Sequence, residues 1–211
     1  MSRGRGPRRS DRFQEGPWTP KTQLGILVKE GKIRSLDEVF AEGMAIQEPQ
    51  IVDRLLPDLK QEVIGINLVQ KQTDAGEKSR FKAMVVVGNM DGYVGLGQGK
   101  AKQVRNAIER AVQVAKVNIT PVRRGCGSWE CNCKRIHSLP FKAVGRCGGV
   151  IVELLPGPRG LGLVSGEVSK TVLKLAGVKD CWTKVRGSTR TTTSFALATF
   201  HALRDTYRLS V

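Results

Sequence analysis

Two runs of β-branched and apolar residues constrain the fold of this 211-residue chain more than any other feature. The runs span Val63 to Val69 and Phe81 to Val87, and a polar segment that contains a glycine, Thr73 to Lys78, separates them. This pattern predicts a β-hairpin with an exposed polar tip. A second turn signal at residues 88–92 precedes a third, short strand that is predicted at Tyr93 to Leu96.

Helices are predicted on both sides of these strands. Residues 22–56 favour short helices, with Ser35 at one helix start and Pro49 and Pro57 as breaks. After the strands, apolar residues at helical spacing predict a helix of about five turns; they are Ala101, Val104, Ile108, Ala111, Val112 and Ala115. Three antiparallel strands with a helix before and after them outline a small α+β domain.

The chain beyond Pro121 repeats this kind of pattern. Strands are predicted at Leu139 to Arg146, at Gly149 to Leu155 and at Val178 to Val185. One helix is predicted to end at Gly177, and a closing helix carries Ala196, Phe200, Leu203 and Tyr207. The order β-β-α-β-α predicts a second, two-layer α/β domain.

The charge of the chain points to a polyanionic partner. Lysine and arginine number 35 against 19 acids, which gives a net charge of +16. Nucleic acid is the leading candidate and an anionic membrane the minor one. The N-terminal segment, residues 1–21, is rich in arginine, glycine and proline, and it is expected to be flexible. Neither a secretory signal nor a membrane span is evident, so a cytoplasmic protein is expected.

A glycine-rich run precedes the predicted central helix. Gly95, Gly97, Gly99 and Lys100 match neither a P-loop nor a dinucleotide-binding pattern, so a nucleotide-dependent enzyme is disfavoured. We instead expect phosphate binding at the helix start, where small glycines meet Lys100, Lys102 and Arg105. The alternative is a solvated basic face on an ordinary helix.

Three cysteines and a histidine lie within twelve residues: Cys126, Cys131, Cys133 and His137. A Cys3His set suits tetrahedral zinc, and the neighbouring arginines and lysine favour thiolates. We therefore predict a structural zinc site, and the alternative is three reduced cysteines beside a surface histidine. Cys147 and Cys181 are expected to be small apolar fillers, with Cys147 as an alternative, substitute ligand. No catalytic constellation and no small-molecule substrate motif is visible, so the chain is predicted not to be an enzyme.

The segments 81–108, 151–164 and 175–184 resemble the universal S-five family of small-ribosomal-subunit proteins, in its archaeal type. The resemblance covers about residues 55 to 205. It implies a domain similar to double-stranded-RNA-binding domains, followed by a C-terminal α/β domain of the family's own type. The expected divisions are a basic flexible extension at 1–21, a helical extension at 22–57, and domains at 58–120 and 121–211. The second of these domains carries the Cys/His-rich insert at 126–137.

The resemblance also implies a function. Family members are structural constituents of the small subunit that bind rRNA near the channel through which mRNA enters, and they support decoding accuracy. The implied partners are small-subunit rRNA, mRNA and the ribosomal proteins S-four, S-three and S-eight. The hairpin tip occupies the family's RNA-touching loop. The alternative function is a free-standing RNA-binding regulator or a zinc-dependent RNA enzyme.

Aromatic residues make up only 5% of the chain, which disfavours base stacking as the main binding mode and leaves shape and phosphate contacts. The candidate RNA-binding residues are therefore cations, each of which has a solvated surface charge as its alternative role. They are Lys71, Lys78, Arg80, Lys100, Lys102, Arg105, Arg123, Arg124, Arg146, Arg159, Arg186 and Arg190.

Overall fold

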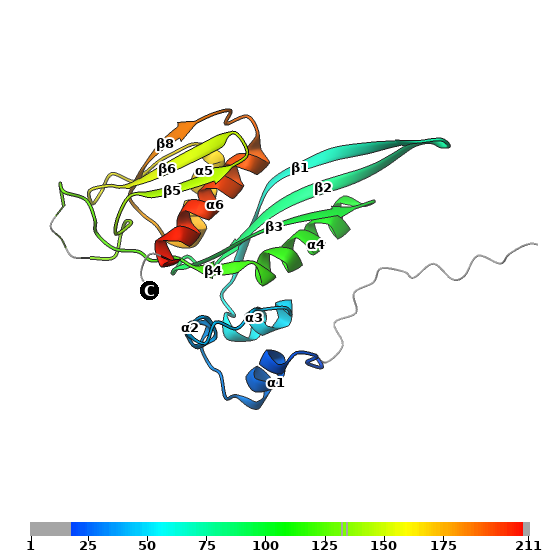
Figure 1. Ribbon diagram of the computed structural model, residues 1–211, viewed down its shortest axis with the longest axis horizontal. Coiled ribbons are helices and arrows are strands. Elements are labelled where there is room, and N and C mark those ends of the chain that lie inside the picture. The colour runs from blue at the N-terminus through cyan, green and yellow to red at the C-terminus, as the bar shows by residue number, and fades with distance from the viewer. Residues whose placement is uncertain (1–17, 132, 134, 209–211) are drawn as a thin grey trace, which may run out of the picture.

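The computed structural model describes residues 18–131, 133 and 135–208, so most of the predicted flexible extension lies outside the described residues. The described part contains two four-stranded sheets and six helices, which confirms the predicted α+β class. The elements stack in four layers (Figure 1). In order, these are one helix, the first sheet, a pair of helices and the second sheet.

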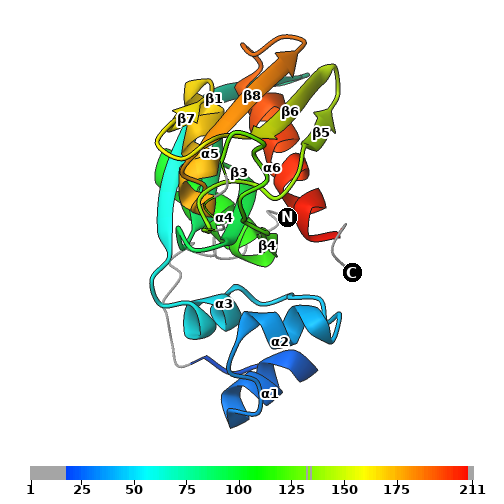
Figure 2. The same ribbon diagram turned by 90° about the vertical axis from the view of Figure 1, so that its left-hand side faces the viewer.

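Three short helices form a separate layer beside this body (Figure 2). They are α1 (Gln23–Glu30), α2 (Leu36–Ala41) and α3 (Pro49–Leu55). The Ser35 hydroxyl accepts the Glu38 N–H at 3.4 Å, so the predicted helix start is confirmed. The helices share a core with Ile119, and a 2.6 Å ion pair between Lys116 and Asp53 links them to the body.

The first sheet has the order β1-β2-β3-β4, and all its neighbouring strands are antiparallel. Its elements are β1 (Lys60–Thr73), β2 (Gly76–Gly88), β3 (Tyr93–Ala101), α4 (Val104–Val117) and β4 (Ile119–Pro121). Helix α4 covers one face, where Ala107, Ala111 and Ala115 are fully buried against β2. On the opposite face of the sheet, Met84 and Val86 point into a core that both sheets share.

The second sheet has the order β5-β6-β8-β7, with β7 parallel to β8. Its elements are β5 (Ala143–Cys147), β6 (Val150–Pro156), β7 (Leu163–Val164), α5 (Glu167–Ala176), β8 (Cys181–Arg186) and α6 (Thr192–Arg208). Helices α5 and α6 lie between the two sheets and contact both. No described element covers the outer face of the second sheet.

Several boundaries differ from the sequence expectations. The third strand continues to Ala101 instead of ending at Leu96, so the predicted five-turn helix begins only at Val104. The strand expected from Leu139 begins at Ala143, and the two-residue strand β7 was not predicted. The expected division at residues 120 and 121 falls inside β4, where Pro121 pairs with Tyr93.

Candidate nucleic-acid interface and metal centre

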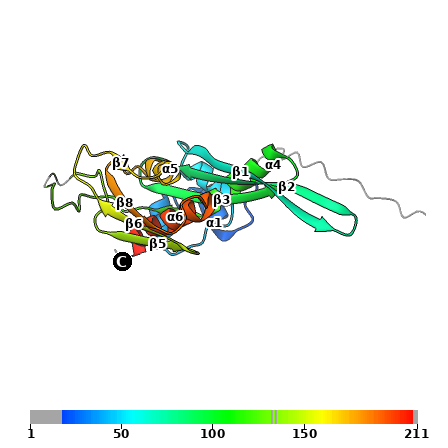
Figure 3. The same cartoon turned by 90° about the horizontal axis from the view of Figure 1, so that it is seen from above.

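The β1–β2 hairpin extends well beyond the body of the molecule (Figures 1 and 3). Strand pairing continues to Thr73 and Gly76, and the Thr73 hydroxyl donates to the Gly76 carbonyl oxygen at 2.7 Å. Nearly all side chains from Asn67 to Arg80 are exposed, on both faces. The outer hairpin is therefore held by backbone hydrogen bonds without packing, a state that is marginal in water without further contacts.

The register of the strands gathers cations on one face of this hairpin. Lys71 pairs with Lys78 and Lys82 pairs with Lys100, while Arg80 lies between the two pairs in β2. Because side chains alternate between faces, all five project to the side opposite α4. We call these five residues the hairpin cation face. None of them forms an ion pair with a described acid.

Lys82 was missed by the sequence analysis, although its signal was present. Lys78, Arg80 and Lys82 follow each other at the two-residue period of a strand, and this period puts them on one face. The other face of the outer hairpin is neutral or acidic: Gln72 pairs with Glu77, and the Gln70 amide donates to Ser79 at 3.3 Å. The asymmetry between the two faces is therefore a property of the register.

The interpretation of the glycine run as a phosphate cradle was wrong. Gly95, Gly97 and Gly99 lie in β3 and face α4, and a Cβ on Gly97 would lie 2.2 Å from the Ala111 carbonyl oxygen. The glycines thus let the helix lie close to the sheet. Lys100 belongs to β3 instead of the helix start, and it contributes to the hairpin cation face.

Only Arg105 of the three expected cations lies within the first turn of α4. Its Nε donates to Glu109 at 3.0 Å, which partly neutralises its charge. Lys102 is exposed just before the helix, and the cap residue Gln103 makes no side-chain capping bond. The structure therefore does not bring these cations together around a glycine-lined anion site.

The remaining candidate cations are dispersed. Arg146 and Arg186 lie on the outer face of the second sheet, where Arg186 Nε is 3.8 Å from a Glu153 oxygen. The pKa of Glu153 is lowered, chiefly by a hydrogen bond from the Lys142 ammonium, which lies 2.8 Å from the carboxylate. Arg159 and Arg190 are exposed in loops.

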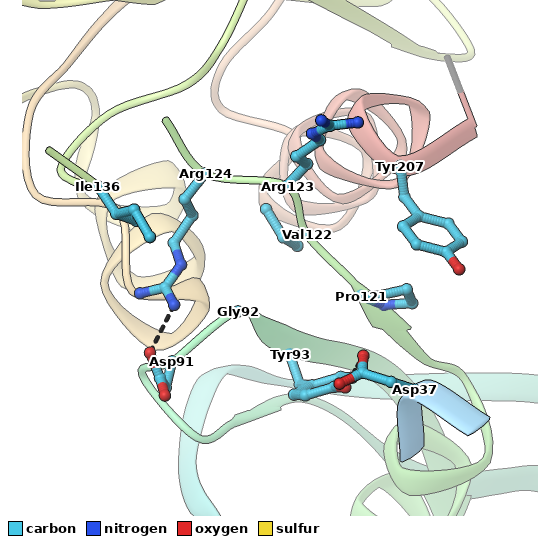
Figure 4. Close-up of a pocket in the computed structure, with 10 residues that line it drawn as sticks. All are labelled: Asp37, Asp91, Gly92, Tyr93, Pro121, Val122, Arg123, Arg124, Ile136 and Tyr207. Carbon is cyan, nitrogen blue, oxygen red and sulfur yellow. Dashed lines mark hydrogen bonds and ion pairs between the residues drawn. The ribbon is translucent and has the colours of Figure 1, made fainter. Parts of the chain in front are cut away.

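A cavity of about 470 Å³ opens where α2, β4 and the end of α6 meet (Figure 4). On one side Arg124 donates to Asp91 at 2.5 Å, so this candidate RNA-binding arginine is held internally. Beside it, the Tyr93 hydroxyl donates to Asp37, and burial together with this bond raises the pKa of Tyr93. The bond between Tyr93 and Asp37 joins the helical extension to the body. Arg123, at the rim, is exposed.

The four predicted metal ligands converge. The ligand atoms of Cys126, Cys131, Cys133 and His137 all lie within 4.8 Å of one another. The Cys126 and Cys133 sulfurs are 3.6 Å apart, close to the ~3.8 Å expected between two thiolates on a tetrahedral zinc. Cys147 and Cys181 are not members of this group, and Cys181 is buried as expected.

The orientation of the histidine is set by an acid that the sequence analysis missed. His137 is only 5% exposed, and its Nδ1 lies 2.8 Å from Oδ2 of the buried Asp180. The other ring nitrogen, Nε2, lies 3.8 Å from the Cys131 sulfur. Asp180 is itself fixed by the Gly162 N–H at 2.8 Å. A carboxylate on the far side of a histidine is the usual support of a metal-ligating imidazole.

The thiols have unequal acidity. The pKa of Cys131 is lowered to about 6, chiefly by a hydrogen bond from the Arg159 backbone N–H and next by Cys133. Partial burial raises the pKa of Cys126. A thiolate at Cys131 near neutral pH suits metal binding. The donor set, its spacing and the oriented imidazole therefore fit a zinc ion.

Comparison with known proteins identifies the family. Residues 59–123 match the family described as "Ribosomal protein S5, N-terminal domain", and residues 145–210 match "Ribosomal protein S5, C-terminal domain". The chain belongs to the ribosomal protein S5 family. The predicted resemblance is thus confirmed, and the Cys/His segment lies between the two matched regions.

Archaeal relatives match over nearly the whole chain. "Small ribosomal subunit protein uS5" of Pyrobaculum calidifontis is 63% identical, over 90% of this chain and 94% of the relative. The proteins of the same name from Saccharolobus solfataricus and Thermofilum pendens are 59% and 56% identical. The match to the Saccharolobus solfataricus protein covers 90% of this chain and 89% of the relative. The match to the Thermofilum pendens protein covers 92% of this chain and 96% of the relative.

Membership of the family makes the chain a structural, non-enzymatic constituent of the small ribosomal subunit, as predicted. Its archaeal type is confirmed as well. Separately, none of the helices in residues 18–208 that the structure describes is long and apolar enough to cross a membrane.

Proposed function

We propose that the chain binds small-subunit rRNA mainly through the sugar-phosphate backbone, with the hairpin cation face as its principal contact. One observation carries this proposal: Lys71 and Lys78 lie directly opposite each other without a described acid between them. Like charges in this position are unfavourable in the free protein. Phosphate groups would relieve the repulsion, and an RNA groove would supply the packing that the exposed hairpin lacks.

The dispersed cations extend this contact. Lys102, Arg105, Arg123, Arg159 and Arg190 are exposed and suit peripheral phosphates. We give Arg124 a smaller part, because Asp91 and the Gly177 carbonyl oxygen already occupy its guanidinium. The divisions of the chain at residues 21 and 57 remain a proposal alongside these assignments.

The location within the subunit is also a proposal, and family membership supports it. It comprises a position near the channel through which mRNA enters, beside S-four and S-three, and a contribution to decoding accuracy. For S-eight the uncovered outer face of the second sheet is suitable. There Val144 and Trp182 are 46% and 43% exposed, near Arg146 and Arg186.

We further propose that Cys126, Cys131, Cys133 and His137 hold one structural zinc. Four protein ligands complete a tetrahedral shell, which leaves no open position for catalysis. Family membership favours the ribosomal role over a free-standing regulator or a zinc-dependent RNA enzyme. Stable co-sedimentation of the chain with small subunits in high salt is expected, and complete release would favour the regulator.

The sharpest test reverses three charges of the hairpin cation face. The variant Lys71→Glu/Lys78→Glu/Arg80→Glu should bind small-subunit rRNA at least about a hundredfold more weakly. The slope of log affinity against log salt should fall by about 3, since about one counterion is released per phosphate contact. Gln70→Glu, on the other face of the hairpin, is the matched control. Equal affinity and an equal salt slope for wild type and the triple variant would remove the hairpin from the interface.

A further inference from the structure

The segment that holds the candidate metal ligands also exposes a tryptophan. Trp129 is 92% exposed, more than any other large hydrophobic side chain among the described residues. The other two tryptophans differ: the Trp18 ring nitrogen donates to Glu48 at 2.7 Å, and Trp182 is 43% exposed. An almost fully exposed indole leaves a large apolar surface in water, so a partner that covers it gains binding energy.

The backbone beneath Trp129 is fixed. Ser128 is buried, its hydroxyl accepts the Glu130 N–H at 3.3 Å, and its carbonyl oxygen accepts the Cys131 N–H at 3.3 Å. On the other side, the Gly127 N–H donates to the Leu139 carbonyl oxygen at 3.0 Å. A Cβ at Gly127 would lie 2.0 Å from the Pro140 carbonyl oxygen, so the turn lies tightly against residues 139 and 140. The indole therefore projects from a constrained turn.

The charges of this segment indicate what covers the indole. Residues 123–137 contain three arginines and one lysine against one acid, Glu130. Arg123 and Arg135 are both exposed, as is Arg159, whose backbone N–H reaches Cys131. An apolar pocket on a protein would not need these cations, whereas an RNA strand offers phosphates for the arginines and a base for the indole.

We propose that this turn presents Trp129 as a stacking platform for one unpaired base of small-subunit rRNA, flanked by arginine–phosphate contacts. The inference rests on the proposed rRNA binding and specifies how one part of that interface works. It adds a single aromatic contact to a surface that is otherwise basic. The Cys/His segment lies at the end of the molecule opposite the hairpin tip, so the two ends would bind separate parts of the rRNA (Figure 3).

Fluorescence tests the stacking directly. The full-length variant Trp18→Phe/Trp182→Phe retains Trp129 as its only tryptophan, and Trp18→Phe/Trp129→Phe retains Trp182. Binding of each to purified small-subunit rRNA is followed by emission. We expect the emission of Trp129 to be quenched at least about twofold, because a stacked base is in direct contact with the indole, and that of Trp182 to change little.

Affinity provides the second measurement. Trp129→Ala should weaken rRNA binding about tenfold, with an unchanged salt slope because no charge is lost. Trp129→Phe should retain most of the affinity, and Trp182→Ala should match the wild type. In the bound Trp129→Ala complex, chemical probing should find one base newly reactive while protection around the hairpin persists. Equal metal content and melting temperature among the variants verify their folding.

Two results would overturn the inference. One is wild-type affinity for Trp129→Ala together with unquenched Trp129 emission in the rRNA complex. The other is a Trp129 emission that shifts only when other ribosomal proteins are added, which would identify a protein partner. Failure of the wild-type chain to bind rRNA at all would instead refute the proposed function, so the two failures are distinguishable.

Discussion

The hairpin and the Cys/His segment hold exposed residues in place by different kinds of interaction. Each holds exposed residues far from the core, at opposite ends of the molecule (Figure 3). The hairpin uses a backbone ladder from Lys60–Gly88 to Thr73–Gly76 that contains one bulge, between Val63 and Gly65. The described residues of the Cys/His segment form no regular strand, and an isolated bridge between Gly125 and Ser138 closes the segment. In the outer hairpin the ladder leaves nearly all side chains exposed, whereas the zinc that we propose would use four side chains of the second segment to fix its shape.

This difference predicts where a single substitution matters. In the hairpin, position is set by repeated backbone bonds, so loss of one side chain changes binding and leaves the fold intact. In the Cys/His segment, loss of one ligand of the proposed zinc should remove the main restraint on the whole segment, because metal binding is generally coupled to folding. The following predictions test this contrast.

The largest effect is expected from Cys133→Ser. Wild-type protein should contain about one zinc per chain, and the variant none, because three ligands and a hydroxyl hold zinc poorly. The free energy of unfolding should fall by at least about 4 kcal/mol, and proteases should cleave within residues 126–137. Metal analysis and calorimetry check this. Cys147→Ser, outside the cluster, is the matched control and should retain the metal, whereas zinc-free wild type would refute the site.

The packing of α4 against β3, at the base of the hairpin, should be sensitive to Gly97→Ala. The added methyl would meet the Ala111 carbonyl oxygen at 2.2 Å and the Ala115 nitrogen at 2.3 Å, so α4 must move off the sheet. We expect a loss of about 3 kcal/mol in the free energy of unfolding, measured by denaturant titration. Gly65→Ala, where nothing lies within 4 Å, should cost much less. A Gly97→Ala protein as stable as the wild type would contradict this close packing of α4 on β3.

Asp180→Asn should weaken zinc binding about tenfold without abolishing it. Asparagine has a single acceptor oxygen, so it cannot accept both the His137 Nδ1 proton and the Gly162 N–H that Asp180 accepts. The imidazole therefore loses part of the support that directs Nε2 toward the thiols. Competition with a chelator measures the affinity. Asp91→Asn, which breaks only the ion pair with Arg124, should leave zinc affinity unchanged. Equal affinity in both variants would mean that Asp180 serves only the fold.

In both regions the sequence predicted the local features and missed the long-range ones. The two runs of β-branched and apolar residues at 63–69 and 81–87 predicted the hairpin, and the spacing from Cys126 to His137 predicted the cluster, because both signals are local. Asp180 lies 43 residues beyond His137, and only the folded chain brings them together. The role of Gly97 depends on which element covers its face of β3. A glycine run before a helix gives no such information, and so it was taken for an anion site.

The smallest and most diagnostic effect is expected from Lys71→Glu. The new carboxylate would lie opposite Lys78, and replacing a repulsive pair by an attractive one should raise the free energy of unfolding by about 0.5 kcal/mol. Binding to rRNA should nevertheless weaken about tenfold, with a salt slope reduced by about 1. Thermal melts at low salt and filter binding measure the two quantities. Opposite signs would show that the hairpin keeps its like charges for RNA at a cost to its own stability. If both quantities fall together, Lys71 supports the fold instead, and the contrast between the two ends of the molecule fails.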